Sequence, residues 1–148
     1  MNLYNLLLNK AKDDGIIKNV VGAVIVNDDK VLVLTRKQDD FMGGIDELPS
    51  GNLEPNESIY DALIREVKEE TNLDLESVLS FINTFDYLSS SGKKTRQYNF
   101  AIKVKNIDNI LLTEHDSYKW EQLSSIKNNP NITNEVKYTL EIYMFNNK

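Results

Sequence analysis

The stretch that decides the fold is residues 51–73, which read GNLEPNESIYDALIREVKEETNL. Its second half predicts a helix over residues 58–71, because apolar side chains recur there at helical spacing. These apolar side chains fall on one face of the helix: Ile59, Ala62, Leu63 and Val67. The segment therefore predicts an amphipathic helix that follows an irregular loop.

Polar residues just before this helix are suited to cap it. Asn56 or Glu57 can cap its start, and Ser58 with Asp61 has the spacing of a capping box. Either arrangement would satisfy backbone N–H groups that have no partner inside the helix. The helix is therefore expected to start close to residue 58.

Three carboxylates crowd one side of the same helix. Glu66, Glu69 and Glu70 stand at positions i, i+3 and i+4, within an arc of about 100°. Like charges at this spacing repel each other by a few tenths of a kcal/mol per pair, roughly. Two interpretations remain open: a solvated acidic face, or a binding site for a hard divalent cation such as Mg²⁺, which prefers oxygen ligands.

The charge of the chain is concentrated in this region. The chain has 148 residues, with 17 Lys and Arg against 23 Asp and Glu. Eight of the acids and two of the bases lie between Glu54 and Glu76, so this segment carries the whole net charge of −6. The other 125 residues hold 15 acids and 15 bases. No basic surface for nucleic acid is expected, but a bound cation would make the acidic segment attractive to phosphate.

Composition closes off several other chemistries. There is no Cys, which excludes disulfides, thiolate nucleophiles and cysteine-based metal sites, and there is a single His. No apolar run approaches the ~20 residues that a membrane helix needs. The first ten residues show neither a basic leader nor a cleavage signal, so a cytoplasmic protein without a membrane partner is expected.

The rest of the chain predicts strands mixed with a few helices. Residues 3–13 and 133–145 have helical patterns, and residues 37–56 predict a loop with one short strand near Leu48. The predicted strands are 20–26 and 31–35, which form a hairpin, then 78–87, 95–104 and part of 117–127. This order predicts an α/β fold: one domain over residues 1–148, with a mixed β-sheet packed between helices.

The spacing of residues 51–73 resembles the Nudix box of the Nudix hydrolases. That motif is Gly, five residues, Glu, seven residues, Arg-Glu, an aliphatic residue, any residue, Glu-Glu, any residue, Gly and an aliphatic residue. Eight of its nine defined positions match: Gly51, Glu57, Arg65, Glu66, Val67, Glu69, Glu70 and Leu73. The departure is Asn72 in place of Gly, at a position expected to need a left-handed backbone, where Asn is the best substitute for Gly.

The resemblance implies a Nudix fold and roles for the box residues. Glu66, Glu69 and Glu70 would ligate Mg²⁺, with Mn²⁺ as a substitute, and the backbone carbonyl of Ser50 would add a ligand. Glu57 would support the site, either as a further ligand through water or by orienting Arg65. Arg65 would hold the carboxylates in place.

Segments outside the box extend the resemblance. Arg36, at the end of a predicted strand, matches a family position that contacts substrate phosphate, and Arg96 beside the second hairpin is another candidate contact with an anionic substrate. Residues 114–120 resemble a downstream segment in which an acid or His reaches the metal site. Four candidates for the general base stay open: Glu66, Glu70, Glu114 and His115.

The function implied by the resemblance is Mg²⁺-dependent hydrolysis of a pyrophosphate linkage. The substrate would be a small nucleotide, namely a nucleoside diphosphate linked to another moiety, as in a nucleoside triphosphate, ADP-ribose or a nucleotide sugar. The alternative is a non-catalytic Nudix-like sensor of such nucleotides. The sequence leaves open whether the protein forms a homodimer.

Overall fold

The computed structural model describes residues 2–148, and its first element is helix α1 (Leu3–Asp13). Asn2 caps this helix, because its side-chain oxygen accepts a hydrogen bond from the backbone N–H of Asn5 at 2.9 Å. Gly15 then turns the chain with a φ of 75°, a left-handed conformation that glycine adopts without strain. The helix predicted over residues 3–13 is confirmed.

The predicted hairpin is present as β1 (Lys18–Asn27) and β2 (Lys30–Arg36). The loop after it contains two short strands, β3 (Asp46–Glu47) and β4 (Ser50–Asn52), where the sequence predicted one. The two residues between them let the chain change neighbours, since β3 pairs with β2 and β4 pairs with β1. Strands this short have no period that a sequence pattern can reveal.

Helix α2 (Ile59–Thr71) carries most of residues 51–73. Ser58 is its cap: the Ser58 side chain accepts a hydrogen bond from the backbone N–H of Asp61 at 3.0 Å. Asn56 and Glu57, the other candidate caps, precede it. Asn72 ends the helix with a φ of 66°, which is the left-handed backbone that the sequence predicted there.

The second half of the chain follows the predicted order. Two long strands form a hairpin, β5 (Leu75–Leu88) and β6 (Lys94–Val104). Strand β7 (His115–Gln122) continues into a 3₁₀ turn, η1 (Leu123–Asn128), and helix α3 (Asn134–Asn146) follows. No helix of the described part of the chain is long and apolar enough to cross a membrane.

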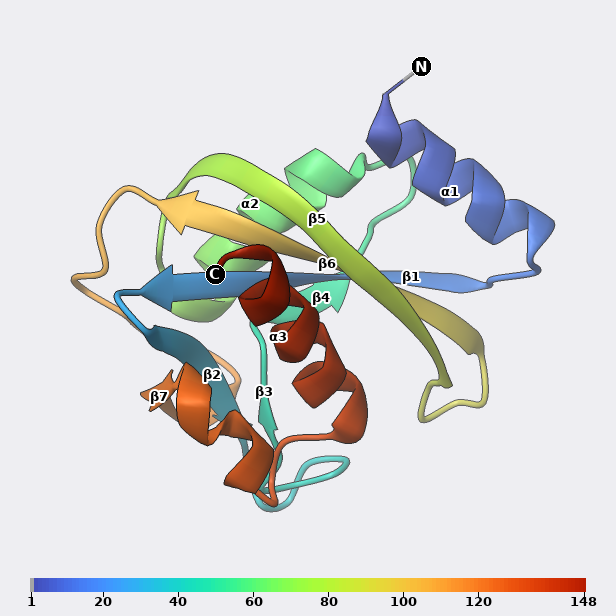
Figure 1. Ribbon diagram of the computed structural model, residues 1–148. Helices are drawn as coiled ribbons and strands as arrows, with labels where there is room; N and C mark the ends of the chain where they lie inside the picture. Colours follow the sequence, from blue (N-terminus) through green and yellow to red (C-terminus); the bar gives the residue numbers. More distant parts are fainter. Residues whose placement is uncertain (1) are drawn as a thin grey trace.

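Seven strands form one mixed sheet (Figure 1). The main order is β3-β2-β1-β6-β5, with β4 paired to β1 and β7 paired to β2. Strands β1 and β6 are parallel, whereas the other neighbours are antiparallel. Strand β1 pairs with β2, β4 and β6. It therefore joins β4, in the loop before α2, to the rest of the sheet.

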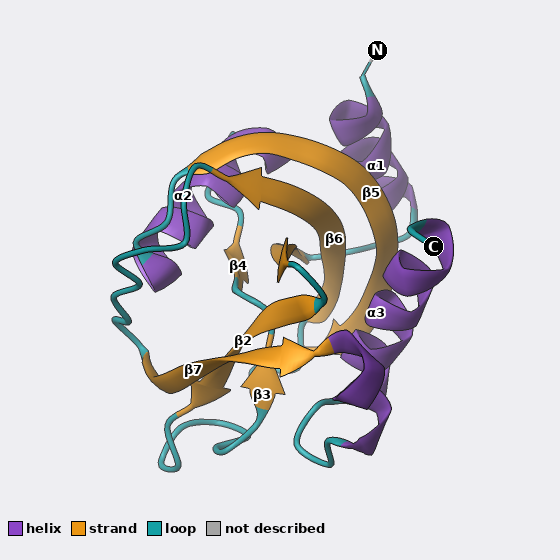
Figure 2. Ribbon diagram, turned by 60° about the vertical axis from the view of Figure 1, so that its left-hand side comes forward, coloured by secondary structure: helices purple, strands orange, loops and turns teal. Residues whose placement is uncertain are grey.

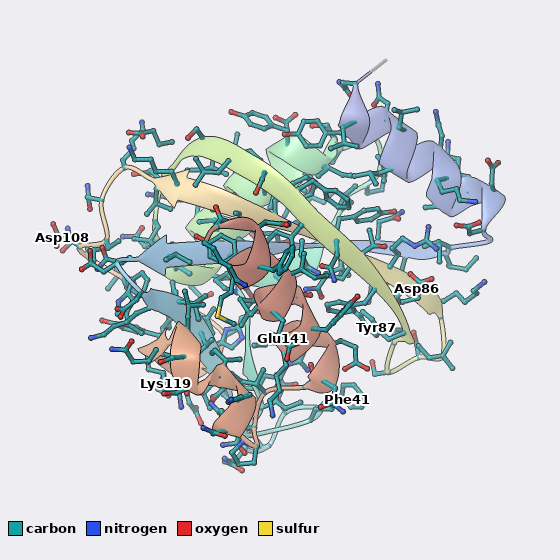
Figure 3. All side chains as sticks on the ribbon, viewed as in Figure 1. Phe41, Asp86, Tyr87, Asp108, Lys119 and Glu141 are labelled. Atoms are coloured by element: carbon teal, nitrogen blue, oxygen red, sulfur yellow. The ribbon has the colours of Figure 1, made fainter. Side chains whose placement is uncertain are left out.

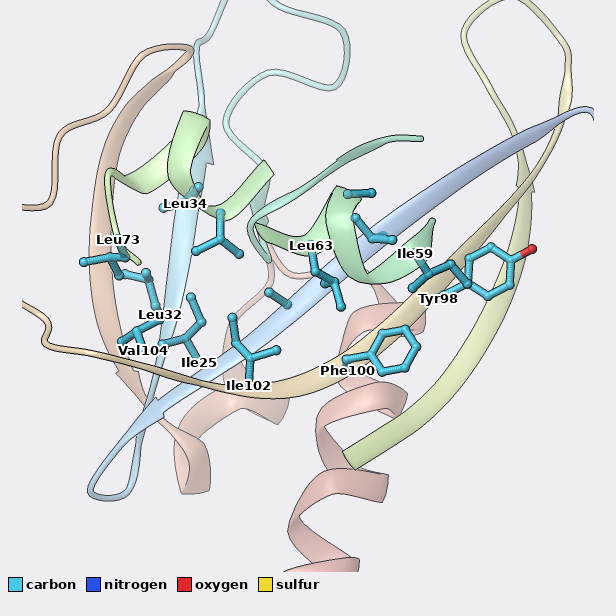
Figure 4. Packing of buried hydrophobic residues seen from close by; sticks show 14 of the residues in the cluster. Ile25, Leu32, Leu34, Ile59, Leu63, Leu73, Tyr98, Phe100, Ile102 and Val104 are labelled. Atoms are coloured by element: carbon cyan, nitrogen blue, oxygen red, sulfur yellow. The ribbon is translucent and has the colours of Figure 1, made fainter. Parts of the chain in front are cut away.

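Two hydrophobic cores cover the two faces of this sheet, because side chains alternate along its central strands. On one face, Val21, Ala23 and Ile25 of β1 pack with residues of α1 and α2. On the other face, Val24 packs with residues of β2, η1 and α3. Figure 2 shows α2 and α3 on opposite sides of the curved sheet, and Figure 4 shows the α2 side of the core. The predicted fold class is confirmed.

The left-handed turn at Asn72 gives a direct test of helix termination. Replacing Asn72 by Ala or by Gly removes the same side-chain hydrogen bond, from Nδ2 to the carbonyl of Asn109. Only Ala must strain to hold a φ near 66°. Urea unfolding should therefore show Asn72→Ala about 1 kcal/mol less stable than Asn72→Gly. Equal stabilities would show that the backbone conformation is not what this position constrains.

Candidate metal centre

The guanidinium of Arg65 ties the box loop to the acidic face of α2. Its Nε and Nη2 donate to the two carboxylate oxygens of Glu57, each at 2.8 Å, and Nη2 also donates to the carbonyl of Asn52 at 2.8 Å. Its Nη1 donates to Glu66 at 2.8 Å and to Glu69 at 3.2 Å. These charge-assisted hydrogen bonds are roughly twice as strong as neutral ones. Arg65 therefore fixes three box carboxylates around one positive charge.

Gly51 is needed because the carboxylate of Glu66 lies against its backbone. A Cβ atom built on Gly51 would lie 2.0 Å from both Cδ and Oε2 of Glu66. No side chain fits at this distance, so any other residue would push the carboxylate away. Burial raises the pKa of Glu66, although the hydrogen bond from Arg65 opposes this shift. Glu66 is thus held in a tight, partly desolvated position.

Glu70 is the most buried carboxyl of the box. Its Oε1 accepts a hydrogen bond from the backbone N–H of Ser50 at 2.7 Å, which joins α2 to β4. Burial raises the pKa of Glu70 to about 8, and the nearby charges of Glu47 and Glu66 add to this shift, while Ser50 and His115 oppose it. Without a cation, the carboxyl of Glu70 therefore loses its proton at a higher pH than an ordinary glutamate.

Glu69 and Glu114 are exposed to solvent, and the charges of both act on Glu66. The Glu69 side chain is more than half exposed. Glu114 is also exposed, and its charge contributes to raising the pKa of Glu66. Thr113 donates from its hydroxyl to the backbone carbonyl of Glu69 at 3.1 Å, so the segment before β7 is fastened to α2. The structure therefore brings Glu114 to the acidic face of α2.

His115 lies behind this face and contacts a residue that sequence reasoning did not assign to the site. Its Nε2 lies 2.8 Å from Oε2 of Glu47, and the same oxygen accepts a hydrogen bond from Nε of Arg36 at 3.0 Å. Burial lowers the pKa of His115, but the hydrogen bond to Glu47 and the charge of Glu70 outweigh it, so the pKa is raised. Among residues 2–148, the buried Nδ1 of His115 has no hydrogen-bond partner.

Glu47 was missed because its partners are distant in the sequence. Strand pairing places Glu47 opposite Leu34, and Arg36 opposite His115. A signal was present, since Glu47 stands four residues before Gly51 in the approach to the box. Its position alone, however, did not distinguish a site residue from an ordinary strand residue.

Arg96 is held by two carboxylates outside the box. Its Nε and Nη2 donate to Asp86, at 2.7 and 2.9 Å, and its Nη1 donates to Asp14 at 2.9 Å. These contacts join β6 to β5 and to the end of α1. A role for Arg96 in binding substrate stays a prediction.

The donors of this centre fit a hard cation. The carboxylates of Glu66, Glu69 and Glu70 and the backbone of Ser50 offer oxygen atoms alone, as Mg²⁺ prefers. Burial raises the pKa values of Glu66 and Glu70, so a bound cation would favour the ionised form of both carboxyls. Within the described part of the chain, no three acidic or His side chains are already gathered closely enough to ligate an ion. Binding would therefore have to draw the carboxylates together.

The comparison with protein families agrees with this geometry. The profile of the NUDIX domain matches residues 17–141. The chain belongs to the Nudix hydrolase family. Nudix hydrolase 2 of Arabidopsis thaliana is 33% identical over an alignment of 129 residues that covers 84% of this chain and 45% of that protein. The chain thus spans less than half the length of this relative.

Other Nudix proteins resemble the chain over more of their length. An ADP-ribose pyrophosphatase of Methanocaldococcus jannaschii is 28% identical over 84% of this chain and 71% of its own. A Nudix hydrolase of Nitrosomonas europaea has a similar structure, with a TM-score of 0.74 and 27% identity over 87% of this chain and 89% of its own. A MutT protein of Methanosarcina mazei Go1 shares the fold, with a TM-score of 0.78 and 24% identity over 91% and 98%.

The raised pKa of Glu70 predicts how stability depends on pH without metal. Between the ordinary value of 4.5 and about 8, the folded protein keeps a proton that the unfolded chain loses, so stability falls as pH rises through this window. Glu70→Gln cannot lose a proton. Urea unfolding in EDTA should show Glu70→Gln more stable than the parent by on the order of 3 kcal/mol near pH 8, and little changed near pH 5.

Glu69→Gln is the matched control for this measurement, because Glu69 lies one position away on α2 with an exposed side chain. It should show no comparable gain near pH 8. If Glu70→Gln changed stability equally at both pH values, the burial of an ionisable group would not be the cause.

Proposed function

We propose that this protein hydrolyses a pyrophosphate linkage in a nucleoside diphosphate joined to another moiety, with Mg²⁺ as its cofactor. A nucleoside triphosphate, ADP-ribose or a nucleotide sugar fits this description. The observation that carries the proposal is the complete set of box carboxylates: Arg65 binds Glu57, Glu66 and Glu69, and the backbone of Ser50 binds Glu70. The name of the M. jannaschii relative, an ADP-ribose pyrophosphatase, supports the same class of substrate.

The box residues would hold the cation. Glu66, Glu69, Glu70 and the carbonyl of Ser50 supply oxygen ligands, and Glu57 acts chiefly by orienting Arg65, to which it is bound through both oxygens. When bound, Mg²⁺ would screen the phosphate charges and lower the pKa of the attacking water. Glu66 and Glu69 already share Nη1 of Arg65, so this guanidinium keeps them close before the ion arrives.

Arg36 is suited to bind the phosphate side of the substrate. Its Nε is held by Glu47 and its Nη1 by the carbonyl of Phe41, at 2.8 Å, so the guanidinium has a defined direction. It lines the same cavity as Ser50, whose N–H holds Glu70. Positively charged groups placed in this way stabilise negative charge that develops on a departing phosphate.

Glu114 is better placed than His115 to act as a general base. The His115 ring is buried and its Nε2 is engaged by Glu47, whereas Glu114 is exposed beside Glu66. A base must reach the proton of the attacking water. We therefore assign proton transfer to Glu114, and the positioning of Glu47 and Arg36 to His115. Once ionised, Glu70 serves as a metal ligand.

Turnover of a nucleotide panel tests the proposed function. With Mg²⁺, the purified protein should release phosphate, pyrophosphate or a nucleoside monophosphate from at least one nucleotide of the class. Glu69→Gln and Glu70→Gln should each lower kcat by on the order of 100-fold or more, because each removes a ligand charge. Glu76→Gln is the control: it is an exposed acid of the same segment outside the box. Tight nucleotide binding without turnover would instead favour the sensor.

Gly51→Ala tests whether Glu66 must lie against the backbone. The added methyl group would displace the Glu66 carboxylate, so the Mg²⁺ concentration for half-maximal activity should rise by on the order of 10-fold. The same substitution in a Glu66→Gln background should add little further loss, because the two changes act on one group. Additive losses would show that Gly51 acts through something other than Glu66.

A further inference from the structure

A cavity of about 260 Å³ lies beside the box, bordered by Arg36 and Ser50. Three aromatic side chains line it: Phe41, Phe85 and Tyr87. Figure 3 shows Phe41 and Tyr87 on the same side of the molecule, close to the start of α3. Aromatic faces of this kind stack on nucleobases regardless of which base is present. The aromatic walls therefore suit a base but do not select one.

Gln97, a buried residue of β6, is one of the polar residues that line this cavity. Its Nε2 donates to Oδ1 of Asn99 at 2.8 Å, and Asn99 is fully buried. Both residues point to the face of the sheet opposite Tyr98 and Phe100, because side chains alternate along a strand. Two amides thus occupy positions where a central strand usually has apolar side chains.

The amide pair is fastened at its far end to two other elements. Asn99 donates from Nδ2 to Oδ1 of Asn83 on β5 at 3.1 Å, and lies 3.4 Å from the hydroxyl of Thr139 on α3. The Thr139 hydroxyl in turn lies 3.0 Å from Oδ1 of Asn83 and 3.0 Å from the carbonyl of Glu135. Gln97 is therefore the end of a chain of hydrogen bonds that runs from α3 to the cavity.

Gly22 on β1 leaves room for the side chains of this row of hydrogen bonds. A Cβ atom at Gly22 would lie 2.3 Å from Oδ1 of Asn99 and 2.5 Å from Nε2 of Gln97. Stability alone does not call for these residues, since replacing both partners of a buried hydrogen bond by apolar groups of the same shape is nearly neutral. This row of hydrogen bonds instead orients the amide group of Gln97 at the wall of the cavity.

The amide of Gln97 has unused hydrogen-bonding capacity. Among the described residues, its Oε1 and its second Nε2–H make no hydrogen bond, so an acceptor and a donor stand side by side. Gln pairs through both atoms with adenine, whose exocyclic amino group donates and whose adjacent ring nitrogen accepts.

We propose that Gln97 determines base specificity by hydrogen-bonding the base of a nucleotide in this cavity, and that the base it selects is adenine. Cytosine has the same pair of groups, but its single ring covers less of the aromatic walls. The inference rests on the proposed function for the identity of its ligand as a nucleotide, but not on turnover.

Binding of nucleoside monophosphates to the metal-free chain of 148 residues tests this inference by calorimetry. AMP, IMP and CMP are compared in EDTA, because IMP has a carbonyl in place of the amino group of AMP and a proton on the adjacent ring nitrogen, which reverses donor and acceptor. AMP should bind at least about 10-fold more tightly than IMP. A site built to pair with a given donor and acceptor is left with unpaired polar groups when the ligand carries them in reverse. AMP should also bind more tightly than CMP. Equal binding, tighter binding of IMP or CMP, or no binding of any would overturn the proposal.

Substitutions at Gln97 and Thr139 distinguish a specific role of the Gln97 amide in the preference for AMP over IMP from general effects on the cavity. Gln97→Leu should bring the affinities for AMP and IMP to within about 2-fold of each other, because it keeps the bulk but removes the amide. Thr139→Val, which does not touch the base, should lower the ratio partially and serves if Gln97→Leu does not fold. Gln122→Leu, at an exposed glutamine on β7, should leave the ratio unchanged. An unchanged ratio in Thr139→Val and Gln97→Leu would overturn the assignment.

The outcome is distinguishable from that of the proposed function. If AMP is preferred but no nucleotide is hydrolysed, the hydrolase proposal fails and the role of Gln97 stands. If nucleotides are hydrolysed without preference for adenine, the reverse holds. With turnover, Gln97→Leu should raise KM for adenine substrates about 10-fold and leave kcat nearly unchanged, because it removes binding that substrate and transition state share.

Discussion

The hydrogen bonds of one guanidinium hold the acidic centre together. Arg65 is bound to both oxygens of Glu57 in the loop and to the carbonyl of Asn52 at the end of β4, while its remaining nitrogen contacts Glu66 and Glu69. Without this positive charge, carboxylates at helical spacing would repel each other and turn toward solvent. A loop with almost no regular structure is thereby fastened to a helix, and three carboxylates of the box are kept near one positive charge.

Two carboxyls of the same site are partly desolvated, which disfavours their ionised forms, and a bound cation would offset this effect. Glu66 is pressed against Gly51, and Glu70 is buried deeply enough that its pKa is raised to about 8. Groups that are poorly satisfied in isolation concentrate at functional sites, where a ligand supplies the missing charge. The net charge of −6 therefore has a local explanation: it belongs to one segment arranged around a place for positive charge. The balanced remainder of the chain forms the sheet and helices that support this segment.

Much of the fold followed from local patterns. The helix at residues 3–13, the first hairpin and helix α2 were each predicted within a few residues, because hydrophobic period and turn residues act over short distances. Strands β3 and β4 were incompletely predicted, since they are two and three residues long and owe their existence to neighbours elsewhere in the sheet. Strand β5 begins at Leu75, three residues before the predicted start at residue 78, because Leu75 already pairs with Val104 of β6.

For the candidate site, the local sequence was enough to name the box residues, because their roles depend on spacing along one helix and the loop before it. Contacts between distant residues required the three-dimensional structure. Glu47 meets His115, Arg96 meets Asp14, and the amide chain ending at Gln97 crosses three elements. These meetings are set by which strands pair and in what register, and by how α3 packs on the sheet. No periodicity in a single segment encodes such long-range pairing, so only the folded chain decides it.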